Sequence, residues 1–340
     1  MSEFNNRTLS LGSEGLSVNK VENIYYSKHY KAISIISSTI ILFFGLIGNL
    51  SVSIILTFAK NMQSSTNCYL VSVAVADILV LLSTIVPFLY NINQDINISL
   101  LPSWGCSLII YLQYLSVNSS ALTITSFSFE RWVAICYPMK AHTMCTISRA
   151  VKIVIGIWIF NLIYNSSWIY LTGIVKKGPL NGSYKSVCTF RFERRKYMNI
   201  YMFDFMLFYC IPLLLTTFLY CAIIRTLVKR PMSGTTSGRD PRKHMNHSKM
   251  QVVKMLMAVV ILFAMLWLPY RALMVYNSFA SKSYLDLWFL LFARIMVFIN
   301  SAINPILYNA LSGKFRKAFK KFFLWSEEIK DNKPPKGNKN

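Results

Sequence analysis

The stretch KMLMAVVILFAMLWLPYRAL, residues 254–273, carries no charged side chain between Lys254 and Arg271. About 20 largely apolar residues are enough to cross the hydrocarbon core of a bilayer as a helix rising 1.5 Å per residue. A proline inside such a run removes one helical hydrogen bond and kinks the helix, as we expect at Pro269. This stretch therefore predicts a kinked membrane-spanning helix.

Six further apolar runs of similar length lie on both sides of this stretch. With it they cover residues 33–58, 69–90, 104–129, 151–174, 199–224, 252–276 and 285–309. The loops between the runs are short and irregular, and no sequence period repeats along the chain. The first residues, MSEFNNRTLS, lack the apolar core of a cleavable signal peptide, so the first span would act as its own signal. We expect an all-α membrane protein, a bundle of seven helices.

Composition agrees with a membrane protein. Apolar residues make up 54% of the 340 residues and charged residues only 14%, while the formal net charge is +23. Soluble domains usually carry about a quarter charged residues, so lipid is expected to cover much of this chain. A strongly basic chain can also indicate nucleic-acid binding. Nucleic-acid binders place their basic residues on soluble modules, however, so we expect no nucleic-acid partner.

The positive charges predict the orientation. With the N-terminus outside, 22 Lys and Arg residues face the cytoplasm and 12 the exterior, which satisfies the positive-inside rule. We expect a multi-pass plasma-membrane protein with an extracellular tail at 1–32, a seven-helix domain at 33–310 and a disordered cytoplasmic tail at 325–340. Between the last two, residues 312–324 predict a short amphipathic helix on the membrane surface, because its aromatic residues share one face and its lysines the rest.

Cysteines and sequons can be sorted by this orientation. Cys106 and Cys188 are the only cysteines on the expected oxidising side, so we expect a disulfide between them. Asn6, Asn97 and Asn181 begin sequons on the same side and predict glycosylation.

Polar residues inside the spans are expensive in lipid and normally face the bundle interior. Six of them fall at similar depth: Asn49, Asp77, Ser120, Asn300, Ser301 and Asn304. One carboxylate, here Asp77, among hydroxyls and amides is suited to a small hard cation such as Na⁺. The alternative is a water-filled hydrogen-bond network with a protonated Asp77. Apart from this sodium ion, we expect no cofactor.

Several motifs occur in order along the spans. They are SFERWVAICYP (128–138), Trp158, Pro212 with Tyr220, FAMLWLPY (263–270) and NSAINPILY (300–308). In order and spacing they resemble the rhodopsin-like (class A) G-protein-coupled receptors across residues 33–323. Agreement of several independent motifs makes this resemblance far more specific than any one of them.

The resemblance implies roles in activation. Arg131 would leave its neighbour Glu130 to meet a heterotrimeric G protein of the phospholipase-C-activating class, and arrestin and membrane lipid would be further partners. The other residues implied in transmission are Phe263, Trp267, Pro269, Tyr220, Asn304, Pro305 and Tyr308.

Two departures from the family pattern stand out: Trp132 replaces the usual tyrosine, and Lys249 replaces an acid that holds the arginine in some relatives. We therefore expect measurable basal activity, which Lys249→Glu would lower.

The outer parts of the spans indicate the ligand class. Amine receptors need a carboxylate where this chain has Gln113, and opsins need a lysine that is missing between Tyr284 and Tyr308. A polar pocket remains, formed by Tyr114, Asn118, Asp204, Tyr270, Arg271 and Arg294. An unpaired arginine in a membrane costs about 3 kcal/mol or more. Asp204 can therefore compensate one of the two arginines, and the other keeps donors for ligand carbonyls.

Within the family, the chain more narrowly resembles receptors for a short amidated peptide hormone. That resemblance implies that Tyr114 and Asn118 hold a pyroglutamyl ring, and that Tyr270 and Arg294 contact the rest of the peptide. A receptor for a neuromedin-like or ghrelin-like peptide is the alternative. A transporter would show paired repeats in two halves of the chain, which this sequence lacks. The four histidines form no catalytic set, so we expect no enzyme.

Overall fold

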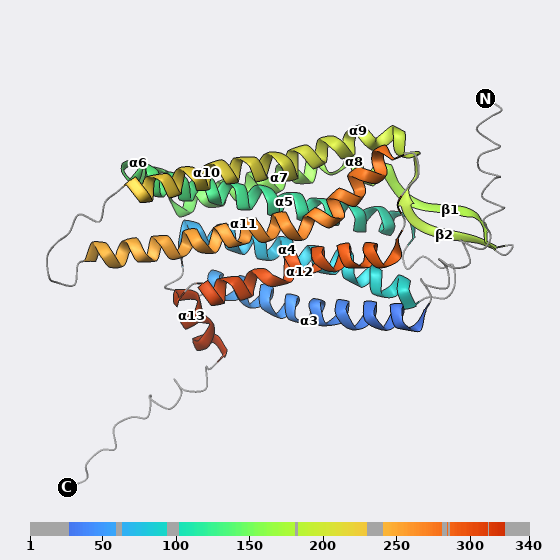
Figure 1. Cartoon of the computed structure of the whole chain (residues 1–340), viewed down its shortest axis with the longest axis horizontal. Helices are drawn as coiled ribbons and strands as arrows, with labels where there is room; N and C mark the ends of the chain where they lie inside the picture. The colour runs from blue at the N-terminus through green and yellow to red at the C-terminus, as the bar shows by residue number, and fades with distance from the viewer. Residues whose placement is uncertain are drawn as a thin grey trace, which may run out of the picture.

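The computed structural model describes residues 27–58, 63–93, 102–180, 183–229, 241–280, 284, 286–311 and 313–323. Long helices lie roughly side by side and form one bundle (Figure 1). They are α3 (Lys28–Phe58), α4 (Ser65–Asn93), α5 (Ser103–Cys136), α7 (Ile147–Tyr164), α9 (Arg194–Phe205) continuing into α10 (Ile211–Lys229), α11 (Pro241–Phe279) and α12 (Leu287–Leu311). Shorter helices are α6 (Pro138–Met144), α8 (Ser167–Leu171) and α13 (Gly313–Phe323). The predicted seven-helix bundle is confirmed.

The predicted eighth helix is α13, which follows α12 and turns away from the bundle axis (Figure 1). Its buried Phe315 packs edge-on against Tyr308 of α12, with ring centroids 6.2 Å apart. Arg316 and Lys320 lie exposed on the same helix. The helix therefore has the one-sided apolar face expected of a segment lying along a membrane surface.

Six helical stretches of the described chain are long and apolar enough to cross a membrane: 28–58, 65–93, 147–171, 195–228, 257–279 and 287–310. The seventh, α5, is the longest of the early helices but contains many polar residues. Ser116, Asn118, Ser119, Thr123 and Ser128 are all buried on it. Because α5 packs against α4, α7, α8 and α10, these polar groups face other helices rather than lipid.

The three prolines that the sequence motifs single out lie in helices α10, α11 and α12, and α4 contains a further one, Pro87. Pro269 lies inside α11 and Pro305 inside α12. Pro212 stands at the start of α10, directly after a π-helical turn at Met206–Cys210. Because proline cannot donate a backbone hydrogen bond, the wider turn accommodates the missing bond. The turn begins just after Asp204, the carboxylate that α9 carries into the bundle.

The segment after α8 departs from the irregular loop that we expected. Strands β1 (Thr172–Leu180) and β2 (Ser183–Phe190) form an antiparallel pair that projects from one end of the bundle (Figure 1). Leu180 pairs with Ser183, which leaves the dipeptide Asn181-Gly182 between the strands. Asn-Gly is the most favoured sequence for a two-residue hairpin turn, and this signal was missed. We call this end of the bundle the hairpin end.

A disulfide joins the hairpin to the bundle, as the sequence predicts. It links Cys106 near the start of α5 to Cys188 on β2, with a Cα–Cα distance of 5.7 Å. Ser107 adds a hydrogen bond of 2.7 Å to the carbonyl of Thr172, the first residue of β1. Both strands are therefore attached to the same helix end.

Helix α11 begins at Pro241, inside the segment 230–247, whose Ser, Gly, Pro and charged residues predict a mobile cytoplasmic loop. This expectation was wrong for residues 241–247. Prolines are well tolerated in the first turn of a helix, which suits Pro241 as a starting residue. Asn6, Asn97, Asn181 and the tail at 325–340 lie outside the described residues, so their predicted glycosylation and disorder stay predictions.

Candidate functional site

Four polar residues from different parts of the chain meet inside the bundle toward its hairpin end. They are Asn118 on α5, Asn165 at the end of α7, Asp204 on α9 and Arg271 on α11, and all four are buried. Polar groups in the interior of a membrane bundle are costly and usually functional. This cluster is the candidate ligand site.

Asp204 is the centre of the cluster. One carboxylate oxygen accepts a hydrogen bond of 2.8 Å from Nδ2 of Asn118, and the other lies 3.8 Å from Nη1 of Arg271. The sequence left open which of the two intramembrane arginines Asp204 compensates. The structure pairs it with Arg271.

Arg294 stays without a carboxylate partner in the described part of the chain. Its guanidinium lies over the ring of Phe88, 5.3 Å from the centroid, and its side chain is half-buried on α12. A cation over an aromatic face is stabilised without using its N–H donors. Arg294 therefore keeps hydrogen-bond donors for an incoming group.

Aromatic rings border the cluster. Tyr114 stacks on Trp168 of α8 with ring centroids 4.0 Å apart, and Tyr270 lies edge-on to Trp267 at 6.4 Å. The guanidinium of Arg271 lies 5.1 Å from the centroid of Trp267. Trp168 is completely buried, yet its Nε1 has no hydrogen-bond partner among the described residues. A buried unpaired donor costs about 1–3 kcal/mol, which a ligand acceptor could recover.

Gln113 is placed differently from the other predicted residues. Its Nε2 donates a hydrogen bond of 2.7 Å to the carbonyl of Ser83 on α4. In this arrangement Gln113 joins two helices, and its role toward a ligand stays a prediction. Trp168 and Asn165 were missed as site residues. Each carries a side chain that can form hydrogen bonds inside the expected span 151–174, and this feature could have indicated them.

Comparison with known sequences shows the family of the chain. Residues 48–308 match the model of the 7 transmembrane receptor (rhodopsin family). The chain belongs to this receptor family. The predicted narrower resemblance is also confirmed: the thyrotropin-releasing hormone receptor of Mus musculus is 41% identical over 86% of this chain and 79% of its own length. That of Gallus gallus is 40% identical over 92% and 83%.

The bombesin receptor subtype-3 of Ovis aries is a more distant relative. It is 28% identical over 84% of this chain and 73% of its own length. The chain is therefore a multi-pass membrane receptor and belongs to a family without enzymatic activity, as expected from the sequence.

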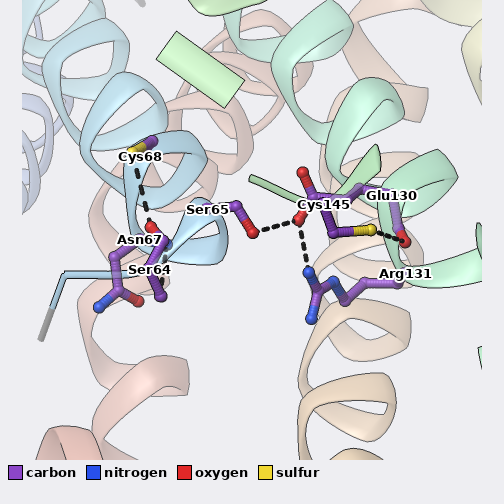
Figure 2. A network of polar contacts seen from close by, with 7 residues as sticks. All are labelled: Ser64, Ser65, Asn67, Cys68, Glu130, Arg131 and Cys145. Atoms are coloured by element: carbon purple, nitrogen blue, oxygen red, sulfur yellow. Dashed lines mark hydrogen bonds and ion pairs between the residues drawn. The ribbon is translucent and has the colours of Figure 1, made fainter. Parts of the chain in front are cut away.

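At the end of the bundle opposite the hairpin, the receptor carries a second polar network (Figure 2). Glu130 and Arg131 form an ion pair of 2.5 Å, and Ser65 of α4 donates a hydrogen bond of 2.7 Å to the same Glu130 oxygen. Sγ of Cys145 lies 3.8 Å from the backbone carbonyl of Glu130. Burial raises the pKa of the Cys145 thiol, and the charge of Glu130 raises it further, so this thiol stays a neutral donor.

Ser65 attaches Glu130 to α4 and was missed in the sequence because 65 residues separate the two. A hydrogen bond to a charged group contributes about 1.5–3 kcal/mol. We expect Ser65→Ala to weaken the hold on Glu130 and to raise ligand-independent second-messenger production several-fold. Ser65→Thr keeps the hydroxyl and should behave as the parent.

Ser64→Ala is the matched control for this test. Ser64 caps the backbone of Asn67 at 3.3 Å and makes no contact with Glu130 in the described structure. Equal basal signalling in the parent and the Ser65→Ala variant, at equal surface expression, would show that this hydrogen bond does not restrain Arg131.

The other predicted transmission residues lie along the bundle axis. The hydroxyl groups of Tyr220 and Ser128 are 3.1 Å apart and connect α10 to α5. Phe263 and Trp267 are buried neighbours on α11, with ring centroids 6.2 Å apart. Trp132 packs edge-on against Tyr137 at 5.1 Å. Lys249 lies on α11, but its side chain is outside the described part of the structure.

The predicted sodium-site residues are all buried: Asn49, Asp77, Ser120, Asn300, Ser301 and Asn304. Nδ2 of Asn304 donates to Asp77 at 2.7 Å, and Nδ2 of Asn49 donates to the carbonyl of Ser301 at 2.9 Å. Oδ1 of Asn49 is buried without a partner among the described groups. The described residues contain no cluster of three or more His, Cys, Asp or Glu that could hold a metal ion. One carboxylate with neutral oxygens fits a monovalent cation, such as sodium, better than a divalent one.

Proposed function

We propose that this receptor binds a short amidated peptide, thyrotropin-releasing hormone or a close analogue, in the cluster at its hairpin end. The observation that carries the proposal is the pairing of Asp204 with Arg271, which leaves Arg294 as a cation with free donors. A nearly neutral peptide rich in carbonyl groups suits such a site. The resemblance to the hormone's receptors supplies the ligand class.

The resemblance implies a contact for each of these residues. Tyr114 and Asn118 would hold the pyroglutamyl ring, Tyr270 the middle residue and Arg294 the prolinamide end. Gln113 of α5 would contact the ligand from the side of the site that faces α4. Arg271 would keep the carboxylate of Asp204 in position. The stacked pair of Tyr114 and Trp168 supports this arrangement, because it forms a rigid apolar wall beside the polar groups.

Signalling would follow as a population shift. A ligand that contacts α5, α11 and α12 better in one state favours that state by its difference in affinity. Movement about Pro269 would be transmitted through Phe263 and Trp267 toward Arg131. In the state described, Arg131 remains paired with Glu130.

At the end of the bundle opposite the hairpin, the proposed partners are a phospholipase-C-activating G protein and arrestin. Membrane lipid would lie along α13. The residues proposed to stabilise the active state are Tyr220, Asn304, Pro305 and Tyr308. A sodium ion would lie at Asp77. The receptor would lie in the plasma membrane with its N-terminus and the hairpin outside.

Calcium mobilisation tests this proposal. Cells expressing the chain are challenged with pyroGlu-His-Pro-amide and, separately, with longer amidated peptides. A calcium response to the tripeptide that requires phospholipase C supports the proposal. A response to a longer peptide alone would overturn the tripeptide assignment and favour another peptide receptor, in line with the similarity to bombesin receptor subtype-3.

Arg294 gives a sharper prediction. Arg294→Ala removes the free donors and should lower tripeptide potency by at least about tenfold, which corresponds to about 1.4 kcal/mol. Arg294→Lys keeps the charge but loses the planar guanidinium, so its tripeptide potency should lie between those of the parent and Arg294→Ala. Dose–response curves for calcium release measure the effect.

Arg191→Ala is a suitable control, because exposed Arg191 at the hairpin end donates to Ser103 at 3.3 Å and lies outside the cluster. If Arg294→Ala changes potency no more than Arg191→Ala does, Arg294 only braces the helices.

A further inference from the structure

A groove lies on the outside of the bundle, where α7 and α8 meet α9. Its volume is about 550 Å³, and it is lined by Tyr164, Ser167, Asn199, Ile200 and Phe203. Sites for small molecules in proteins usually measure about 300–1,000 Å³. The three lining residues of α9 are exposed and belong to a membrane-spanning stretch, so the groove opens toward lipid. It is separate from the polar cluster inside the bundle.

The lining residues are sorted by depth in the membrane. Helix α7 runs toward the hairpin end, and α9 runs away from it (Figure 1). Ser167 therefore lies further out than Tyr164, and Asn199 lies one helical turn, about 6 Å, further out than Phe203. Polar side chains thus form the outer end of the groove, and aromatic rings form its deeper part.

The length of the span places this boundary at the membrane surface. Residues 195–228 form a stretch of 34 residues. At 1.5 Å per residue it is about 51 Å long, whereas the hydrocarbon core is about 30 Å thick, so about 10 Å at each end lies among the headgroups. Asn199 lies about 6 Å from the start of the stretch, at headgroup level, and Phe203 about 12 Å, in hydrocarbon.

The polar groups at the outer end can still form hydrogen bonds. The side-chain amide of Asn199 makes no hydrogen bond within the described part of the chain. Oγ of Ser167 donates to the carbonyl of Tyr164 at 3.2 Å and keeps its lone pairs. A single hydroxyl group can use both side chains, because it accepts from the amide of Asn199 and donates to Oγ of Ser167.

The deeper part of the groove is a wall of packed rings. The ring centroid of Tyr164 lies 6.3 Å from that of Phe203 and 5.1 Å from that of Phe208. The hydroxyl oxygen of Tyr164 is buried, so the ring rather than the hydroxyl meets a molecule in the groove. A rigid apolar body suits such a wall better than a flexible acyl chain, because it loses less conformational freedom on binding.

We propose that this groove binds a membrane sterol. The sterol hydroxyl lies between Asn199 and Ser167 at headgroup level, and the fused rings lie against Tyr164 and Phe203 in the outer leaflet. A phospholipid would bring a phosphate, which suits the exposed Arg195 one turn further out on α9. Arg195 does not line the groove, however, and the groups that do are uncharged.

Photolabelling of the full-length receptor in cell membranes tests the proposal. The probe is a cholesterol analogue with a photoreactive diazirine on its ring system, and mass spectrometry locates the labelled residues. We expect labelling on α7, α8 and α9 at the groove, displaced by excess cholesterol. Epicholesterol, whose hydroxyl has the opposite configuration, should displace the probe about fivefold less well, because it misplaces the hydrogen-bonding group.

Variants of the lining residues test the two parts of the groove. Asn199→Leu removes the amide at similar volume and should lower the displaceable labelling about fivefold. Ile200→Trp fills the groove and should abolish the labelling. Asn93→Leu is the matched control and should label as the parent does. Asn93 is an exposed amide at the hairpin end of α4 that donates to the carbonyl of Leu89 at 2.9 Å.

Three results would each overturn the proposal: labelling spread evenly over the lipid-facing helices, equal labelling of the parent and the Asn199→Leu variant, or equal displacement by the two epimers. Groove labelling by a photoreactive phosphatidylcholine that cholesterol does not displace would also overturn it and assign the groove to phospholipid. None of these results depends on the tripeptide, so the proposed function is tested separately.

Discussion

Replacing Asp204 by Asn is expected to lower the thermal stability of the receptor and to reduce tripeptide potency by about 100-fold or more. The change keeps the shape of the side chain and an oxygen that can accept from Asn118. It removes the charge that lies 3.8 Å from Arg271, whose side chain is only 6% exposed. Leaving one partner of a buried ion pair alone costs about 3–5 kcal/mol. The loss of stability is measured by fluorescence-detected unfolding of the purified receptor and by surface expression.

A double variant tests whether the ion pair is the cause. Combining Asp204→Asn with Arg271→Gln removes both charges, so it should recover most of the lost stability although potency stays low. Recovery by Arg271→Gln would be the signature of a coupled pair. Equal stability of the parent and the Asp204→Asn variant would contradict the pairing on which the free donors of Arg294 depend.

Removing the disulfide is expected to have the second-largest effect. Cys106→Ala or Cys188→Ala should destabilise the receptor by about 2–5 kcal/mol, because the bond closes a long stretch of chain. The bond joins residues 82 positions apart and holds β2 against the start of α5. Surface expression and the unfolding temperature should fall together.

The double cysteine variant should match either single variant, since all three lose the same bond. Cys221→Ala is the control, because Cys221 is an exposed free thiol on α10. A double variant clearly worse than both single variants would show that the cysteines act separately from the bond.

Local patterns in the sequence were enough to predict the helices. An apolar run such as 254–273 specifies its own helix, since backbone hydrogen bonds must be satisfied within the segment in lipid. The hairpin at 172–190 was not predicted, because β-pairing depends on contacts between strands as well as on the run itself. Only the Asn181-Gly182 dipeptide indicated it locally.

The site could be predicted only in part, for a geometric reason. Residue types identified Asp204, Arg271 and Arg294, but the rotation of three helices decides which arginine meets the carboxylate. Asn165 begins an Asn-Ser-Ser sequon in the sequence, whereas in the structure it is an interior amide bonded to Asn118. Contacts between distant segments are set by packing, which a single sequence does not display.

The most direct test of the central claim is equilibrium binding of radiolabelled pyroGlu-His-Pro-amide to membranes that contain the receptor. The geometry predicts saturable binding that is displaced by the unlabelled tripeptide and weakened at least about tenfold by Arg294→Ala. Arg191→Ala should bind as the parent does. Absence of saturable tripeptide binding in a well-expressed receptor that binds a longer amidated peptide would contradict the assignment.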